Sequence, residues 1–193
     1  ASTMGRPLFA GIERADSFVI DPHKWLFSPF DCAAVLYREP RLAGAALTQH
    51  AEYLETLDIT LDRQGGEWNP SDFAIHMTRR VRGLPLWFSV AAHGTRAYDI
   101  AVTRGLELAR YAARAIEAAP HLELLMQPEL SVVLFRRPGW TAEQYQAWSD
   151  AALAAGTAFV VPTVHDGETV FRFCFVNPTT TEADVDDILT AMA

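Results

Sequence analysis

The sequence is poor in cysteine and in basic residues, and it has no long apolar run. Two cysteines among 193 residues, Cys32 and Cys174, are too few for a disulfide framework and are typical of a reducing cytoplasm. Sixteen basic against 24 acidic residues give a net charge of -8, which argues against a nucleic-acid partner. No apolar run approaches the ~20 residues of a membrane span, and residues 1–6 lack the layout of a signal peptide. We therefore expect a soluble, cytoplasmic protein that binds neither nucleic acid nor membrane.

Several patterns of common catalytic and metal sites are missing as well. The sequence has no His-Glu-x-x-His, no Gly-x-Ser-x-Gly and no glycine-rich phosphate loop. Four scattered histidines lack metal-ligand spacing and are interpreted as surface or core residues: His76, His93, His121 and His165. The one basic cluster, Arg-Arg-Val-Arg at 79–82, is interpreted as an ion-paired or solvated helix face. The sequence predicts no metal site.

The most informative stretch is residues 16–26, Asp-Ser-Phe-Val-Ile-Asp-Pro-His-Lys-Trp-Leu. Residues 18–20 predict a short strand, and Pro22 ends it, so that Lys24 lies on a short, stiff connection. The residues that flank Lys24 are apolar, and a desolvated ammonium tends toward the neutral, nucleophilic amine that Schiff-base chemistry requires. For a lysine taken without its neighbours, an ordinary surface position in a turn is the better interpretation.

The wider segment closely resembles the cofactor-lysine segment of the group II pyridoxal-phosphate (PLP) amino-acid decarboxylases. This family includes the aromatic-L-amino-acid, diaminobutyrate and glutamate decarboxylases, and Trp25 is closer to the first two. The resemblance rests on residues 11–17 and 21–26, on Asp-Cys-Ala at 31–33, and on Thr-Arg-Arg-Val-Arg-Gly-Leu-Pro-Leu-Trp-Phe at 78–88. At matching spacing it extends over nearly the whole chain.

The resemblance implies an α/β fold, namely the C-terminal part of a fold-type I, aspartate aminotransferase-like enzyme. Residues 1–94 would form the C-terminal portion of the PLP-binding large domain, with an active-site loop at 48–70. Residues 95–193 would form a linking helix and a small α+β C-terminal domain. In the family the lysine lies well past the middle of the polypeptide, whereas here it is residue 24. We therefore expect this chain to be the C-terminal part of a longer enzyme.

Hydrophobic periodicity and turn residues predict the elements along the chain. Strands are expected at 18–20, 32–37, 122–126, 131–136, 159–164 and 168–176. Helices are expected at 40–47, 71–88 and 95–118, from a capping box at Thr141 to Gly156, and after a capping box of Thr179 with Glu182. Gly83 and Pro85 predict a kink near residue 84. Asp-Gly at 166–167 predicts a hairpin between the last two strands, which would pack with two helices on one face.

The resemblance also assigns roles to individual residues. Lys24 would hold the cofactor, and His23 would contact the cofactor phosphate or the substrate carboxylate. Tyr53 has the spacing of a loop tyrosine that returns a proton to the substrate carbon in the family; the alternative is a tyrosine that packs its ring. Arg172 lies in a segment similar to one in glutamate decarboxylase whose arginine binds the substrate carboxylate. The alternative is a rim arginine paired with a carboxylate of its own domain.

The resemblance implies a PLP-dependent carboxy-lyase of amino-acid, and hence carboxylic-acid, metabolism that converts an L-amino acid to the amine and CO2. In the family, most of the groups that hold PLP lie upstream of the lysine. We therefore expect residues 1–193 to be inactive alone and to form a homodimer or to associate with an N-terminal polypeptide. Two alternatives remain open: another PLP-dependent carbon–carbon lyase of the same fold, of the sphingosine-phosphate lyase kind, or a non-catalytic fragment.

Overall fold

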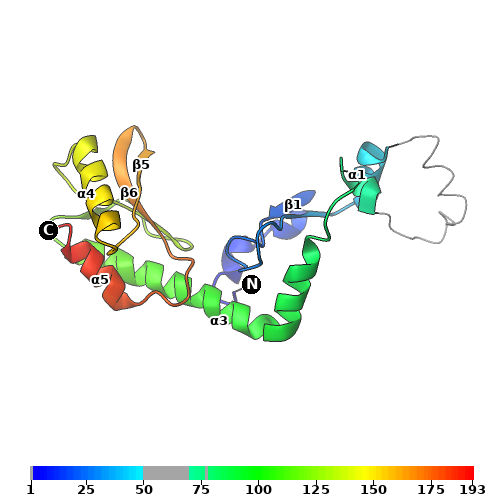
Figure 1. Ribbon diagram of the computed structural model, residues 1–193, viewed down its shortest axis with the longest axis horizontal. Helices are drawn as coiled ribbons and strands as arrows, with labels where there is room; N and C mark the ends of the chain where they lie inside the picture. The colour runs from blue at the N-terminus through cyan, green and yellow to red at the C-terminus, as the bar shows by residue number, and fades with distance from the viewer. Residues whose placement is uncertain (1, 50–69, 77) are drawn as a thin grey trace, which may run out of the picture. The chain divides into compact units, whose positions relative to one another are not determined.

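The computed structural model describes residues 2–49, 70–76 and 78–193, and the chain divides into two compact units (Figure 1). The lysine unit is Gly11–Ala92, and the core unit is Ala1–Ala10 together with His93–Ala193. None of the helices within the described ranges is both long enough and apolar enough to cross a bilayer.

The lysine unit is built around two short antiparallel strands. β1 (Ser17–Ile20) pairs with β2 (Ala34–Tyr37), with Phe18 opposite Leu36, so the strands predicted at 18–20 and 32–37 are neighbours. A 3-10 turn, η2 (Ile12–Arg14), precedes β1. Helix α1 (Pro40–Leu47) follows β2 and begins with a proline, whose missing N–H is no loss in the first turn.

The helix predicted at 71–88 is wrong in its first half. A short 3-10 helix, η4, covers Pro70–Phe73, but residues 74–76 and 78–82 are not helical, and α3 (Gly83–Ala118) begins only at Gly83. Pro85 lies in the first turn of α3, so it starts the helix instead of interrupting it. The apolar spacing misled because Val81, Leu84 and Phe88 are largely exposed and form no buried stripe.

The break predicted near residue 84 occurs instead at Gly94. This residue has φ 72° and ψ 160°, a conformation open to glycine but strained for other residues, and it divides α3 into two helical pieces. The second piece, within the helix predicted at 95–118, carries a buried stripe of Tyr98, Val102, Leu106, Ala109, Ala113 and Ile116. The N-terminal segment, with the 3-10 turn η1 (Arg6–Phe9), is attached to this piece, since the Thr3 amide donates to Asp99 Oδ1 at 2.7 Å.

The core unit contains one antiparallel sheet of four strands in the order β3-β4-β6-β5. The strands are β3 (Glu123–Leu124), β4 (Val132–Arg136), β5 (Pro162–His165) and β6 (Glu168–Cys174). Asp166 and Gly167 both have positive φ between β5 and β6, which confirms the predicted hairpin.

Two further helices complete the core unit. α4 (Ala142–Ala154) begins at the predicted capping box of Thr141 and Gln144. α5 (Glu182–Thr190) begins two residues later than predicted, because its capping box is Thr181 with Asp184. Thr179 is not the cap, since its amide and hydroxyl both donate to Asn177 Oδ1 in a local turn.

One face of the sheet packs against α3, α4 and α5 (Figure 1). Phe171 and Phe173 of β6, and Phe175 just after it, are all buried on this face. The rings of Phe135 and Tyr145 lie 5.7 and 4.7 Å from that of Phe171. The core unit thus encloses a hydrophobic core of its own.

Candidate functional site

Lys24 lies in a hydrogen-bonded turn that directly follows β1, within the connection of residues 21–33 that joins β1 to β2. The Lys24 amide donates to the Asp21 carbonyl at 2.9 Å, and the Ser28 amide donates to the Pro22 carbonyl at 3.0 Å. Pro22 is fully buried. The proline at the end of the strand and these two bonds fix the path of the chain around Lys24.

The Lys24 side chain is 69% exposed, and its Nζ lies 2.7 Å from Asp21 Oδ2. The Lys24 ammonium lowers the pKa of the Asp21 carboxyl, so the two groups form an ion pair. The apolar shielding expected from the neighbouring residues is therefore not found among the described residues. Residues adjacent in a turn do not enclose each other's side chains, and desolvation of Nζ requires segments from elsewhere.

Lys24 is also the only lysine of the chain, since the other 15 of its 16 basic residues are arginines. Its Nζ and the N-terminal amine are therefore the only primary amines. A count of each residue type could have revealed that Lys24 is the only lysine. A single lysine among arginines points to amine chemistry, because a guanidinium does not perform that chemistry.

His23 is anchored across the connection. Its Nδ1 lies 2.5 Å from the Cys32 carbonyl oxygen and 3.1 Å from the Cys32 amide nitrogen, and its own amide donates to the same carbonyl at 3.2 Å. The ring stands edge-on to Phe30. Nε2 makes no hydrogen bond to any described residue, so it is the ring nitrogen that a ligand could use.

Two buried polar atoms of the connection, Trp25 Nε1 and Ser28 Oγ, have no hydrogen-bond partner within the described part of the chain. Leaving such a group unpaired costs about 1–3 kcal/mol. Sequence reasoning missed both, because no local pattern marks a missing partner. The described residues therefore do not satisfy all the buried hydrogen-bonding groups of the connection that carries Lys24.

Two arginines of the basic cluster at 79–82 are ion-paired, as expected, but they lie in a non-helical segment. Arg82 Nε donates to Asp31 Oδ2 at 2.8 Å, and Arg80 pairs with Oδ1 of the same carboxylate. The bond from Arg82, supported by Arg80, lowers the pKa of Asp31 to about 2. Arg80 and Arg82 thus hold the connection at Asp31 although both lie far from it in sequence. No sequence pattern could show these contacts.

Tyr53 lies outside the described residues, as does most of the predicted loop at 48–70, and its role stays a prediction. Arg172 is described: it lies on β6 opposite Leu134, with its side chain exposed. Among the described residues it has no hydrogen bond or ion pair, so the carboxylate partner of the structural interpretation is not found there. The structure brings Lys24 and His23 together in the lysine unit and places Arg172 in the core unit.

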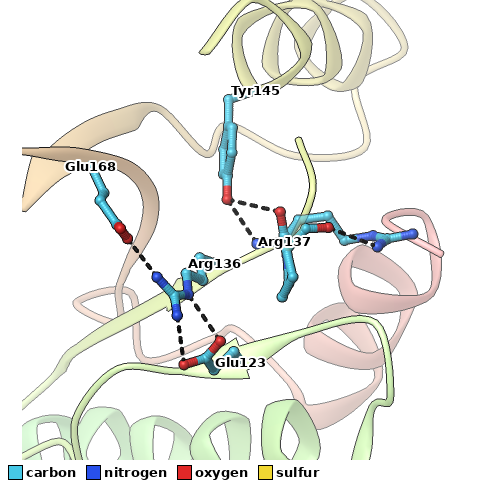
Figure 2. A network of polar contacts seen from close by, with 6 residues as sticks. Glu123, Arg136, Arg137, Tyr145 and Glu168 are labelled. Carbon is cyan, nitrogen blue, oxygen red and sulfur yellow. Dashed lines mark hydrogen bonds and ion pairs between the residues drawn. The ribbon is translucent and has the colours of Figure 1, made fainter. Parts of the chain in front are cut away.

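The ionic network of the core unit uses Arg136 instead of Arg172 (Figure 2). Arg136 donates to both Glu123 oxygens at 2.9 Å and pairs with Glu168 at 2.5 Å, linking β3, β4 and β6. The two carboxylates raise the pKa of Arg136. Beside it, Tyr145 accepts a bond from the Arg137 amide at 2.8 Å and ties α4 to the end of β4. The sequence missed this network because pairing across strands depends on a register that is fixed only in the fold.

Across the described ranges, no group of three or more His, Cys, Asp or Glu side chains is placed to hold a metal ion. Both cysteines are free thiols, Cys32 buried and Cys174 exposed.

Comparisons with known proteins agree with the lysine segment. The family described as "Pyridoxal-dependent decarboxylase conserved domain" matches residues 2–137. The chain is 30% identical to an aromatic-L-amino-acid decarboxylase of Bacillus atrophaeus, over 97% of this chain and 40% of that protein. It is 32% identical to an L-2,4-diaminobutyrate decarboxylase of Rhizobium meliloti, over 97% of this chain and 38% of that protein.

Solved structures give the same result. The crystal structure of mouse CSAD in apo form matches 99% of this chain with a TM-score of 0.78 at 27% identity, while the match covers 42% of that chain. The chain thus spans about two fifths of the length of these three relatives. Because the family match extends over more than half of the residues, the chain belongs to the group II PLP-dependent decarboxylase family.

Proposed function

We propose that this chain forms the C-terminal part of an enzyme that uses PLP to decarboxylate an L-amino acid, and that Lys24 binds the cofactor covalently. The observation that carries the proposal is the only lysine of the chain, held on a hydrogen-bonded turn directly after a strand. The family match and the segment at 21–26 support it. The free thiols are consistent with a cytoplasmic enzyme.

The residues of the lysine unit fit part of what PLP needs. Lys24 offers an accessible primary amine, and His23 offers Nε2 to the cofactor phosphate or the substrate carboxylate. When bound, PLP supplies an electron sink that accepts the electrons left behind as CO2 departs. The ion pair with Asp21 orients the Lys24 amine in this chain and has to be given up when Lys24 binds the cofactor.

PLP also needs a carboxylate at its ring nitrogen, amide donors around its phosphate and a stacking group. We propose that these come from another polypeptide segment, either an N-terminal polypeptide or a second subunit. The exposed Lys24 supports this, because the described residues leave its amine open to solvent. The buried Trp25 and Ser28 atoms support it as well, because the described residues offer them no hydrogen-bond partner. Residues 1–193 alone would then bind PLP weakly and would not turn over.

Two further residues complete the proposal. Tyr53 would return a proton to the substrate carbon. Arg172 would bind the substrate carboxylate through its planar, bidentate guanidinium. Its exposure and its lack of a carboxylate partner among the described residues support this role, because no ion pair would have to be broken first.

The test of the covalent role is borohydride trapping followed by mass spectrometry. The purified chain is incubated with PLP and reduced, and the modified residue is mapped. We expect label on Lys24 and, as background, on the N-terminal amine. Lys24→Arg keeps the charge and should leave only the background. Equal label in both proteins would refute the assignment of Lys24.

The test of the reaction uses the chain mixed with the N-terminal three fifths of a relative. We expect CO2 and the amine from the mixture and neither from the chain alone. Turnover by the purified monomeric chain would show that its site is already complete. Aldehyde from carbon–carbon cleavage without CO2 would show a different lyase, and trapping at Lys24 without any turnover of amino acids would leave a binding fragment.

A further inference from the structure

Asp31 joins two segments of the lysine unit that are remote in sequence. Its carboxylate lies on the connection at 21–33, and its two guanidinium partners lie on the segment at 78–82. Arg82 is the better sheltered partner, with 37% of its side chain exposed against 70% for Arg80. Charge-assisted hydrogen bonds of this kind are about twice as strong as neutral ones, and of the two bonds to Asp31 the one from Arg82 is less exposed to solvent.

The residue after Asp31 is the one on which His23 rests. The Cys32 main chain makes three contacts with His23: its carbonyl oxygen and its amide nitrogen both lie close to Nδ1, and the carbonyl accepts the His23 backbone amide. The Cys32 side chain is only 3% exposed. A shift of Asp31 would move the peptide group between Asp31 and Cys32, because the two residues share it. The amide nitrogen of that peptide group faces His23 Nδ1.

We propose that Asp31, held by Arg82, is a positioning residue for His23. The Asp31–Arg82 ion pair fixes the position of the Cys32 main chain. The Cys32 main chain in turn contacts Nδ1 of the His23 imidazole, so that Nε2 is the ring nitrogen left for a ligand. The inference deepens the proposed function, in which His23 contacts the cofactor phosphate or the substrate carboxylate. Its geometric part depends only on the lysine unit and can be tested without cofactor.

The test compares three variants of the 193-residue chain. Asp31→Asn and Arg82→Gln each break the Asp31–Arg82 pair. Arg80→Gln is the matched control, because it removes a neighbouring guanidinium from the same carboxylate and leaves the Arg82 bond in place. Ring-nitrogen NMR of His23 reports its tautomer and hydrogen bonding, and the rate of disulfide exchange at Cys32 reports how well the connection is closed. The exposed Cys174 is the internal reference for that rate.

We expect Asp31→Asn and Arg82→Gln to shift the His23 ring signals and to raise the Cys32 rate by about tenfold to a hundredfold, the range given by a lost charged hydrogen bond. Arg80→Gln should leave both close to wild type. Faster Cys32 exchange with unchanged His23 signals would overturn the proposal, because the pair would then only stabilise the unit. Unchanged rates and signals in every variant would overturn it too.

A second measurement covers the case in which Asp31→Asn does not fold. NMR signals of the core unit would show whether the rest of the chain is folded. If Asp31→Asn does not fold, Arg82→Lys takes its place in the comparison. A lysine keeps the charge but loses the directed Nε bond, so we expect a His23 shift in the same direction and of smaller size. No shift at all would contradict the proposal. Failure of PLP trapping in the wild type would refute the proposed function and leave the His23 result standing.

Discussion

The two units bury their apolar residues very differently. In the core unit, Phe135 and Phe171 are completely buried between the sheet and its helices. In the lysine unit, Val19 and Leu36 are 63% and 55% exposed, although both lie in strands. Apolar residues on both faces of a strand are typical of a sheet covered on both sides. The comparison shows that one unit has its own core, while the other has strands that the described residues leave uncovered.

The same contrast appears at the two ends of α3. The residues after Gly94 carry a buried stripe that ends at Ile116, whereas Leu84, Trp87 and Phe88 at the beginning of the helix are largely exposed. A two-stranded sheet is marginally stable without further strands or a helix against it. We therefore expect the lysine unit to open far more readily than the core unit.

The largest expected effect is in hydrogen exchange. Amides of β4 and β6 should exchange only on global unfolding, while those of β1 and β2 should exchange through local opening, a difference of roughly 10³-fold or more. Mass spectrometry of peptic peptides measures both in one sample. Adding enough denaturant to unfold the core unit is the control and should remove the difference. Similar protection in the two sheets without denaturant would show that the lysine unit is as stable as the core unit.

The next effect is on the free energy of unfolding. Phe171→Ala should destabilise the core unit by about 3–5 kcal/mol, because it leaves a cavity among the rings of Phe135 and Tyr145. Val19→Ala, in an exposed position of β1, should change the free energy of unfolding by less than about 0.5 kcal/mol. Denaturant titration followed by circular dichroism measures both. A large loss from Val19→Ala would mean that Val19 is covered in solution, for example by a second copy of the chain.

A smaller effect separates the two candidate caps of α5. Thr181→Ala should cost about 1 kcal/mol, since it removes the acceptor of the Asp184 amide. Thr179→Ala removes only the donor to Asn177 and should cost less. The two variants change the same atoms two residues apart, so thermal melts compare them directly. A larger loss of stability from Thr179→Ala than from Thr181→Ala would show that Thr179, the cap predicted from the sequence, caps α5 after all.

The smallest expected effect concerns acid and the lysine unit. The folded-state pKa of Asp31 lies below its ordinary value, at about 2, so its ionised form stabilises the fold. That contribution is complete above the ordinary carboxyl pKa and is lost as the pH falls through about 2. Carboxyl-carbon NMR should give a midpoint near 2 for Asp31, and Arg82→Gln should raise it. An unchanged midpoint would mean that Arg82 does not bind Asp31 in solution.

Local patterns predicted several local features of the core unit. Asp166 and Gly167 turn the chain because both adopt positive φ, and Thr141 caps α4 because Gln144 stands three residues later. The cap of α5 was missed because Thr179 has a competing acceptor in Asn177, two residues before it. The capping rule therefore needs a check for nearby side chains that bind the same donors.

The candidate site was less predictable because its contacts are remote in sequence. The segment around Lys24 identified the lysine, but the exposure of Nζ depends on what covers the turn, and apolar neighbours in sequence do not report this. The bond from Arg82 to Asp31 joins residues that no periodicity relates. Composition did contain one unread signal, the absence of any second lysine.

An exposed turn that carries the only lysine also gives the chain a single cleavage site for a lysine-specific endoprotease. Exposed loops are preferred sites of proteolytic nicking, and the cut after Lys24 would leave two fragments, residues 1–24 and 25–193. A lysine-specific protease does not recognise a lysine whose amine is covalently modified. The fraction of the chain that stays uncut, read from an ordinary gel, therefore gives the fraction of molecules whose Lys24 amine is covalently modified.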